Sequence, residues 1–245
     1  MSLQIIPIHL KIDVQPADDL VDQLLSSSKT SLENGDVLVI SQKIISKHEG
    51  RVVKLESIIP SELSVGIASA YEKDPKLVEA ILSESERIVR MEHGVIIVET
   101  KHGFICANAG IDESNVENGY VTLLPKDSDK SASQIRKRIL QQTGKKVAVI
   151  ISDTFGRPFR MGQTDHAIGI SGMDTILHYE GTPDTFGKIL RVTATAVADE
   201  LCSAAELVMG KTKKRPAAII KNFEFKENTG NIQSIIRVED EDLFR

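Results

Sequence analysis

Acidic, hydroxyl and basic side chains follow an apolar run in the middle of the chain. The run covers residues 147–151, and Asp153, Thr154, Arg157 and Arg160 come directly after it. A carboxylate at such a strand end can bind a hard cation, and arginines can bind phosphate or carboxylate oxygens through two parallel hydrogen bonds. The pattern therefore indicates a metal and phosphate site. The alternative is a surface turn in which Asp153 hydrogen-bonds its own backbone.

A second group of oxygen ligands follows another expected strand, at residues 103–107. Asp112 and Asn115 lie in a compact polar turn just beyond it. With Asp153 and Thr154 they would form an oxygen-dominated set that suits Mg²⁺ or Mn²⁺ better than zinc, since no histidine or cysteine cluster accompanies them. Asx turns and helix caps explain Asp112 and Asn115 individually, so both interpretations stay open.

Residues 205–212 satisfy a relaxed Walker A pattern, with alanine in place of the first glycine. A working P-loop needs a strand before the loop and a helix after it whose N-terminal amides face the phosphates. Here the preceding residues continue an amphipathic helix, Gly210 is placed to cap its C-terminal end, and Pro216 introduces a strand. We therefore expect no P-loop. The basic connection 211–215 either contacts phosphates as an ordinary loop or is a solvated turn.

The bulk composition restricts the class of protein. The chain has 245 residues and 41% apolar content, which suits one large domain or two small ones with an ordinary core. A net charge of −5 argues against non-specific nucleic-acid binding, because that mode needs a basic surface. The N-terminal run is too short for a signal peptide, and no apolar stretch predicts a membrane span. Cys106 and Cys202 lack CxxC spacing, so we expect a reduced, cytoplasmic chain.

Strands and helices that must position these side chains follow one another in mixed order. Strands are expected at residues 3–8, 37–40, 95–98, 103–107, 147–151 and 217–220. Helices are expected after an opening at residues 16–19, and at 60–71, 75–84, 131–142 and 195–209. This order predicts an α+β or irregular α/β fold with mixed sheets and packed helices, and not a P-loop or Rossmann fold.

Three long and unusual segments give the chain a recognisable resemblance. Residues 41–51, 107–116 and 152–160 occur in the right order, and the chain resembles the coenzyme F420-0:L-glutamate ligase family over nearly its whole length. The resemblance implies GTP-dependent addition of L-glutamate, through γ-linkages, to coenzyme F420-0 in coenzyme F420 biosynthesis. It also implies an intertwined homodimer with nucleotide near the subunit interface. Residues 1–245 would form a single catalytic unit, or two subdomains whose boundary the sequence does not fix.

The same resemblance implies roles for individual residues. Asp112 and Asp153 would hold one divalent cation, Mg²⁺ or Mn²⁺, and Thr154 would contribute to a second, with K⁺ as a further candidate ion. The residues implied in nucleotide contact are Lys11, Ile12, Asp13, Val14, Gln42, Lys43, Lys47, Asn115, Met209, Gly210, Lys211, Thr212, Lys213, Lys214 and Arg215. Two features depart from the family pattern: Lys211 stands where an acidic residue completes the second metal site, and residues 10–14 lack the usual Gly and Pro.

The chemistry expected of these groups is activation of a carboxylate by phosphoryl transfer. Lys43 and Lys47 would orient the phosphates of GTP, and an acyl phosphate would then react with the glutamate amine. Arg157 and Arg160 would act as catalytic groups that grip the phosphodiester of the precursor or the carboxylates of glutamate. His166 is a guess for the base, because a packed or surface histidine is the simpler interpretation. The alternatives are a GTP-dependent ligase for another acidic acceptor and a non-catalytic nucleotide-binding or regulatory module.

Overall fold

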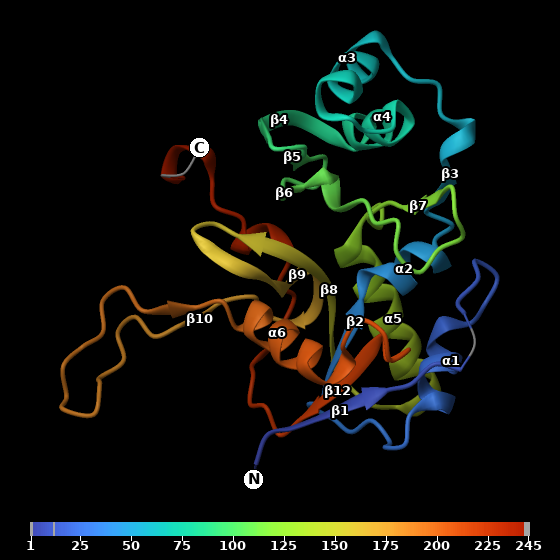
Figure 1. The fold of residues 1–245 in the computed structure, drawn as a ribbon. Helices are drawn as coiled ribbons and strands as arrows, with labels where there is room; N and C mark the ends of the chain where they lie inside the picture. The colour runs from blue at the N-terminus through green and yellow to red at the C-terminus, as the bar shows by residue number, and fades with distance from the viewer. Residues whose placement is uncertain (1, 12, 243–245) are drawn as a thin grey trace.

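The computed structural model describes residues 2–11 and 13–242, and its centre is a six-stranded mixed sheet (Figure 1). The strand order is β1-β12-β2-β8-β9-β13. Their bounds are β1 Gln4–Ile8, β2 Val37–Ser41, β8 Ala148–Arg157, β9 Arg160–Met173, β12 Ala217–Lys221 and β13 Glu227–Asn228. Within this described sheet, β2 and β8 are parallel and the other neighbours are antiparallel. That pattern differs from the parallel Rossmann and P-loop sheets, so the predicted α+β class is confirmed.

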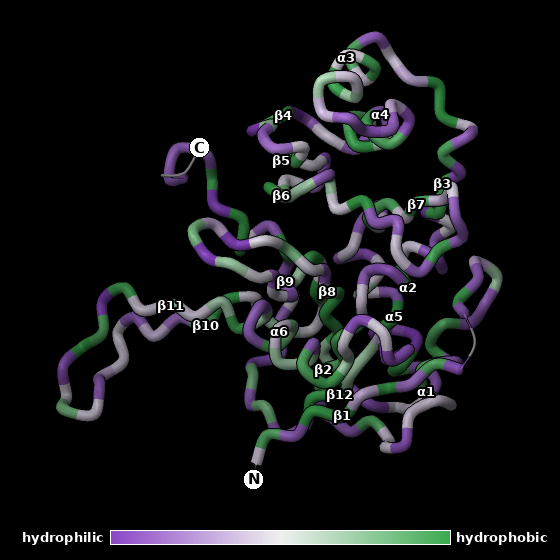
Figure 2. Tube along the Cα trace, in the orientation of Figure 1, coloured by the Kyte–Doolittle hydropathy of each residue, from purple (hydrophilic) through white to green (hydrophobic). Residues whose placement is uncertain are grey.

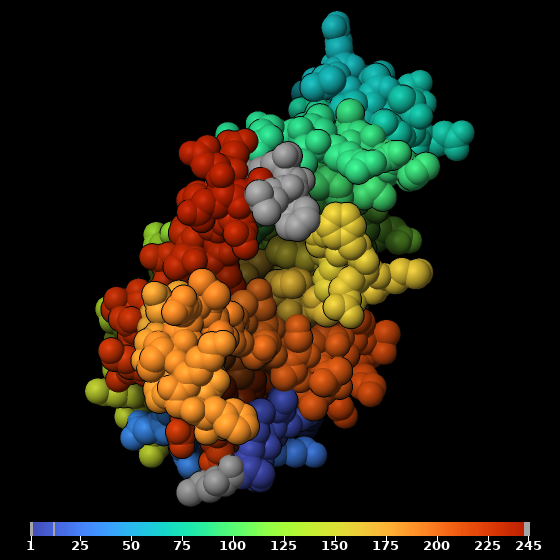
Figure 3. Space-filling model, turned by 90° about the vertical axis from the view of Figure 1, so that its left-hand side faces the viewer, coloured from blue at the N-terminus to red at the C-terminus, as the bar shows by residue number. Residues whose placement is uncertain are grey.

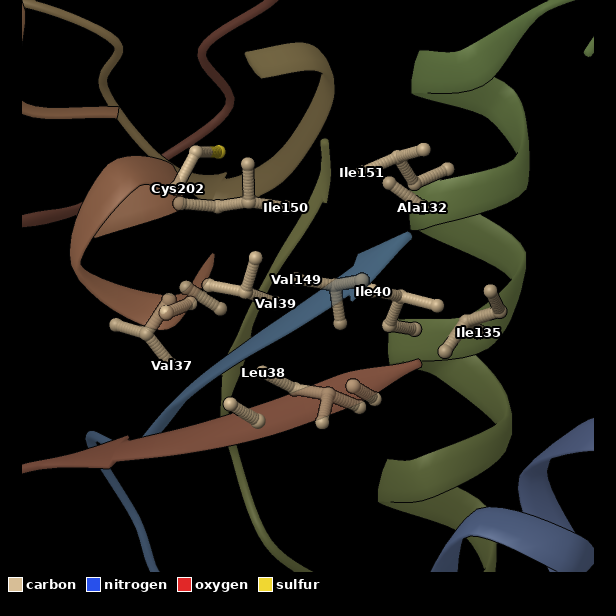
Figure 4. Packing of buried hydrophobic residues seen from close by; sticks show 14 of the residues in the cluster. Val37, Leu38, Val39, Ile40, Ala132, Ile135, Val149, Ile150, Ile151 and Cys202 are labelled. Atoms are coloured by element: carbon tan, nitrogen blue, oxygen red, sulfur yellow. The ribbon is translucent and has the colours of Figure 1, made fainter. Parts of the chain in front are cut away.

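The central strands are apolar along their whole length because both faces of the sheet are covered. Residues 37–40, 148–151 and 217–220 are all buried. Helix α5, Ser128–Thr143, packs on one face, and helix α6, Val197–Met209, packs on the other. Figure 4 shows Ile135 of α5 and Cys202 of α6 on opposite sides of the strands. In Figure 2 the same strands form the hydrophobic centre of the molecule.

Capping residues mark the ends of several helices. Helix α1, Leu20–Ser27, begins after Asp19, whose side chain accepts a hydrogen bond from the Asp22 amide. Helix α2, Gln42–His48, follows β2 without a loop and was not among the helices predicted from the sequence. Helix α5 ends at Gly144 with a φ of 70°, a left-handed conformation that glycine adopts at little cost.

A smaller lobe is inserted between α2 and α5 and lies above the main sheet in Figure 1. Its elements are β3 Val52–Lys54, α3 Glu62–Tyr71, α4 Pro75–Ser83, β4 Ser85–Glu92, β5 Val95–Thr100, β6 Ile105–Ala107 and β7 Tyr120–Thr122. Strands β4, β5 and β6 form an antiparallel sheet whose apolar side packs on α3 and α4. Arg51 and Glu84 form a partly buried ion pair with a 2.6 Å contact where the lobe joins the main sheet.

The β8–β9 hairpin is the main departure from the sequence prediction. A strand end at Ile151 was expected, and this is wrong: β8 continues to Arg157 and pairs with β9, which has 14 residues. Polar side chains do not end the strand because β9 supplies partners for its backbone groups. A register shift between Ile151 and Ser152 marks the point where the apolar run gives way to polar residues.

A long arm leaves the main body between β9 and α6. Its base is the short pair β10, Leu177–His178, and β11, Ala194–Thr195. Figure 1 shows the arm projecting away from the sheet, and Figure 3 shows it facing the viewer as a separate ridge. In the described part of the chain, no helix is both long and apolar enough to cross a membrane.

Candidate functional site

Strand pairing brings the main acidic residues together. Asp153 lies opposite His166, and Thr154 lies opposite Asp165 in the β8–β9 hairpin. The pKa of Asp153 is raised to about 7, chiefly by burial and then by the nearby carboxylates of Asp165 and Asp112. Lys43 opposes this effect and lowers the pKa of Asp153. Carboxylates from two distant parts of the sequence therefore act on one another electrostatically.

An unusual turn delivers Asp112 to this cluster. Asn108, Ala109 and Gly110 follow β6 and have φ values of 53°, 55° and 69°. Two successive non-glycine residues in this left-handed region are strained, and such strain persists where the surrounding structure fixes the backbone. The Asp112 backbone then pairs with Thr122 in both directions, with N to O distances of 3.1 and 2.9 Å. The turn thus holds Asp112 in place by backbone contacts and leaves its carboxylate free to bind other groups.

Two lysines of α2, one helical turn apart, contact different polar partners. The Lys43 ammonium lies 2.7 Å from an oxygen of Asp112 and donates to Ser114 at 2.7 Å. Burial raises the pKa of Asp112, but the hydrogen bonds from Lys43 and Ser114 outweigh it, so the pKa stays below its usual value. Lys47, one helical turn later, is mostly buried and contacts Asp13 at 2.8 Å.

The remaining residues predicted to contact nucleotide occupy different environments. The amide of Leu10 donates to the Lys214 carbonyl at 3.1 Å, so the N-terminal segment lies against the basic connection 211–215. Gly210 caps α6 as predicted, its amide donating to the carbonyl of Glu206 at 2.8 Å. Ile12 lies outside the described residues.

Several of these side chains do not face solvent or are already engaged. Val14 and Met209 are buried in the main core, and Gln42 is buried and accepts a hydrogen bond from Ser46. Arg215 donates to the Val208 carbonyl at 3.3 Å. The exposed members of the predicted set are Lys11, Asp13, Asn115, Lys211, Thr212, Lys213 and Lys214, although Asp13 and Lys211 also make ion pairs. The exposed residues can face a ligand, whereas the buried ones shape the backbone beneath it.

Lys211 enters the acidic cluster from the connection after α6. Its ammonium donates to Thr154 Oγ1 at 2.6 Å and to Asp165 Oδ1 at 2.9 Å. Thr154 in turn donates to the same Asp165 oxygen at 2.6 Å. Figure 3 shows the dark orange segment that follows α6 directly beside the yellow hairpin tip. Sequence reasoning did not propose Asp165, and recognising that β8 and β9 form one hairpin would have placed it opposite Thr154.

His166 lies beside the cluster in a defined environment. Its ring stacks on Phe155 with centroids 5.7 Å apart, and Nδ1 lies 3.5 Å from an Asp199 oxygen. Nε2 and Thr164 Oγ1 are 2.9 Å apart. Asp199 also accepts a hydrogen bond from the Ala167 amide. Both ring nitrogens have polar neighbours, so the histidine is held in one orientation.

The two predicted catalytic arginines lie at the hairpin tip and not within the acidic cluster. Arg157 pairs with Arg160 across the turn and donates to the Met161 carbonyl at 2.8 Å. Arg157 is four positions beyond Asp153 on β8, which at about 3.3 Å per strand residue is roughly 13 Å farther along the strand. The backbone of the hairpin tip therefore lies well beyond the carboxylates, where these arginines suit a ligand group that extends along the strand.

The donor set fits one hard divalent cation held together with a phosphate ligand. In the described chain, no three side chains of His, Cys, Asp or Glu form a metal-binding group, and Lys43 and Lys211 already contact Asp112 and Asp165. Mg²⁺ at nucleotide sites commonly takes only one or two carboxylates, with substrate phosphates completing its shell. Asp153 and Asp112 meet that need. Burial, and then the carboxylates of Asp165 and Asp112, raise the pKa of Asp153, and a bound cation would favour its ionised form.

Comparisons with known proteins identify the family of the chain. The family model for F420-0:Gamma-glutamyl ligase matches residues 9–222. The chain is 45% identical over 229 residues to the coenzyme F420:L-glutamate ligase of Methanothermobacter thermautotrophicus, covering 92% of this chain and 91% of that protein. Identity to the Methanocaldococcus jannaschii protein of the same name is 46% over 215 residues, or 87% of this chain and 86% of that protein. The Methanopyrus kandleri protein, also of that name, is 43% identical over 249 residues, covering 100% and 98%. The chain therefore belongs to the F420-0:gamma-glutamyl ligase family.

Proposed function

We propose that this protein is a GTP-dependent ligase that adds L-glutamate through γ-linkages to coenzyme F420-0. The observation that carries the proposal is the meeting of Asp112 and Asp153 with Lys43 and Lys211 in one cluster. Carboxylates for a cation beside a lysine for phosphates, here Lys43, are parts that phosphoryl transfer needs, and Lys211 adds a further positive charge. The names of the relatives supply the acceptor and the amino acid, because each is a coenzyme F420:L-glutamate ligase.

The reaction begins with activation of an acceptor carboxylate. The acceptor oxygen attacks the γ-phosphorus of GTP, the bond to the β-phosphate oxygen breaks, and GDP leaves. Lys43 and Lys47 point the phosphates towards the acidic cluster, and Lys43 exchanges its partner Asp112 for a phosphate oxygen. Asp112 and Asp153 would hold a divalent ion, which would offset the phosphate charge.

The second step forms the amide. The glutamate nitrogen attacks the carbonyl carbon of the acyl phosphate, inorganic phosphate leaves, and the nitrogen loses a proton. Arg157 and Arg160 bind an anionic group of the precursor or glutamate at the far end of the site. His166, held between Asp199 and Thr164, is the nearest described imidazole to the cluster and is our candidate to accept the proton.

Mass spectrometry after incubation with GTP, Mn²⁺, L-glutamate and F420-0 tests this proposal. Products heavier by glutamyl units support it, whereas glutamyl addition only to another acidic acceptor would identify a different ligase. GTP binding without turnover would identify a regulatory module. An ¹⁸O label in the acceptor carboxylate tests the intermediate, because an acyl phosphate delivers that oxygen to inorganic phosphate.

We also propose that the protein is a homodimer whose subunits exchange the arm between β10 and β11. Phe186 and Val192 of this arm are 96% and 93% exposed, an unfavourable state for large apolar side chains unless another surface covers them. Light scattering on Phe186→Asp combined with Val192→Asp should report a monomer. The matched change Ile59→Asp, at an 88% exposed site on the small lobe, should leave a dimer. A dimeric arm variant would refute this assembly.

A further inference from the structure

Lys211 occupies the position of a cation in the acidic cluster. Its ammonium contacts Thr154 Oγ1 and Asp165 Oδ1 at 2.6 and 2.9 Å, and lies 3.7 Å from an oxygen of Glu206. The Asp165 side chain is only 5% exposed, so its negative charge has little water to stabilise it. A buried carboxylate of this kind requires a cation or strong hydrogen-bond donors beside it. Here a side chain of the chain itself provides that cation.

The fold supports a positive charge at this place in a second way. Lys211 follows the C-terminal end of α6, where unpaired carbonyl groups carry partial negative charge. The connection also begins with Gly210, whose φ of 60° turns the chain back towards the hairpin. The helix end and the turn thus direct the lysine to the sheet, although 56% of its side chain remains exposed.

The position of Lys211 bears on the number of metal ions. Thr154 and Asp165 are hard oxygen donors next to Asp153, and they are the groups that a second divalent ion would use. We propose that the Lys211 ammonium takes the place of that second ion, so that the chain binds one divalent cation per nucleotide. The inference rests on the proposed use of GTP with a divalent cation at Asp112 and Asp153. The Lys211 ammonium is part of the chain and does not dissociate from it. Unlike a metal ion, it cannot bind phosphate oxygens unless it leaves Asp165.

Counting bound Mn²⁺ tests the inference independently of catalysis. Electron paramagnetic resonance measures free Mn²⁺ in titrations of the protein with a non-hydrolysable GTP analogue. The wild type should bind one Mn²⁺ per chain, and Lys211→Glu should bind two, because the new carboxylate joins Thr154 and Asp165. The control Lys137→Glu makes the same charge change at an exposed site of α5, on the opposite face of the sheet, and should bind one.

Each outcome decides the inference. Two Mn²⁺ ions in the wild type, or one in folded Lys211→Glu, would overturn it. Circular dichroism checks folding. If Lys211→Glu does not fold, Lys211→Met is used in its place, because this variant also removes the ammonium from Asp165. Lys211→Met should bind a second Mn²⁺, more weakly than Lys211→Glu. A count of one Mn²⁺ in Lys211→Met would overturn the inference. Glutamyl transfer by the wild type, measured in parallel, separates the proposed function from the inference about Lys211. If the wild type forms product with two bound ions, the inference fails and the proposed function stands. No nucleotide-dependent Mn²⁺ binding in the wild type would contradict both.

Discussion

Replacing Asp153 by asparagine should stabilise the metal-free protein, and by more at pH 8 than at pH 4. The pKa of this carboxyl is raised from 3.8 to about 7, first by burial and then by Asp165 and Asp112. Ionisation therefore costs more in the folded chain than in the unfolded chain. Below about pH 3 the group is mostly protonated in both states, and at about pH 4 the penalty is still small. The penalty grows as the pH rises and is complete above pH 7.

The size of the effect follows from the shift in pKa. One pKa unit corresponds to about 1.4 kcal/mol, so the change from 3.8 to about 7 corresponds to an upper bound of about 4 kcal/mol. The Asp153 side chain retains partial contact with solvent, which reduces this value, and we expect roughly 2 to 4 kcal/mol. Asparagine has nearly the same shape and keeps an oxygen that accepts the amide hydrogen bond from Thr154.

Urea denaturation in the presence of EDTA measures the difference. The free energy of unfolding of Asp153→Asn minus that of the wild type should be small at pH 4 and should increase up to pH 8. Addition of Mn²⁺ with a GTP analogue should reverse the order, because only the wild type then gains from the bound cation. A difference that does not change with pH, or a wild type that is the more stable at pH 8 without metal, would show that Asp153 is not a destabilised carboxylate.

Two further predictions concern the sheet and the phosphate contacts. A Cβ added to Gly169 would lie 2.4 Å from the Ser128 backbone, so Gly169→Ala should lose about 1–3 kcal/mol of stability; Gly156→Ala, which meets nothing within 4 Å in the same hairpin, should change the melting temperature far less. Equal melting temperatures for both variants would contradict the packing of α5 on β9. Lys43→Met removes the lysine that contacts Asp112. The variant should bind GTP about tenfold more weakly or worse, because a hydrogen bond from a charged group is lost. Calorimetry in the presence of Mn²⁺ measures this change. An unchanged Kd would remove Lys43 from the phosphate site.

The central sheet was predictable because its strands carry a strong local signal. Residues 37–40 and 217–220 are continuous apolar runs between turn residues, and both form fully buried strands. Gly210 is likewise a local signal, and its capping role excludes the P-loop interpretation without any tertiary information. Local patterns of this type depend on burial and backbone geometry, which the sequence expresses directly.

The partners within the site could not be predicted in the same way. Asp165 acquires its role only from the antiparallel register that sets it opposite Thr154. Lys211 reaches both residues across more than 40 positions of sequence, through a turn whose direction depends on Gly210 and the hairpin together. Long-range pairing of this kind leaves no periodic pattern, so an isolated aspartate or lysine looks like an ordinary surface residue.

The most direct test of the proposed activity is glutamyl transfer by wild type and Asp153→Asn side by side. Each protein is incubated with GTP, Mn²⁺, L-glutamate and F420-0, and the masses of the products and the release of GDP are followed. The proposal predicts glutamyl adducts with GDP release for the wild type and neither for the folded variant. Adducts formed at an unchanged, metal-dependent rate by Asp153→Asn would contradict a reaction centred on the Asp112 and Asp153 carboxylates.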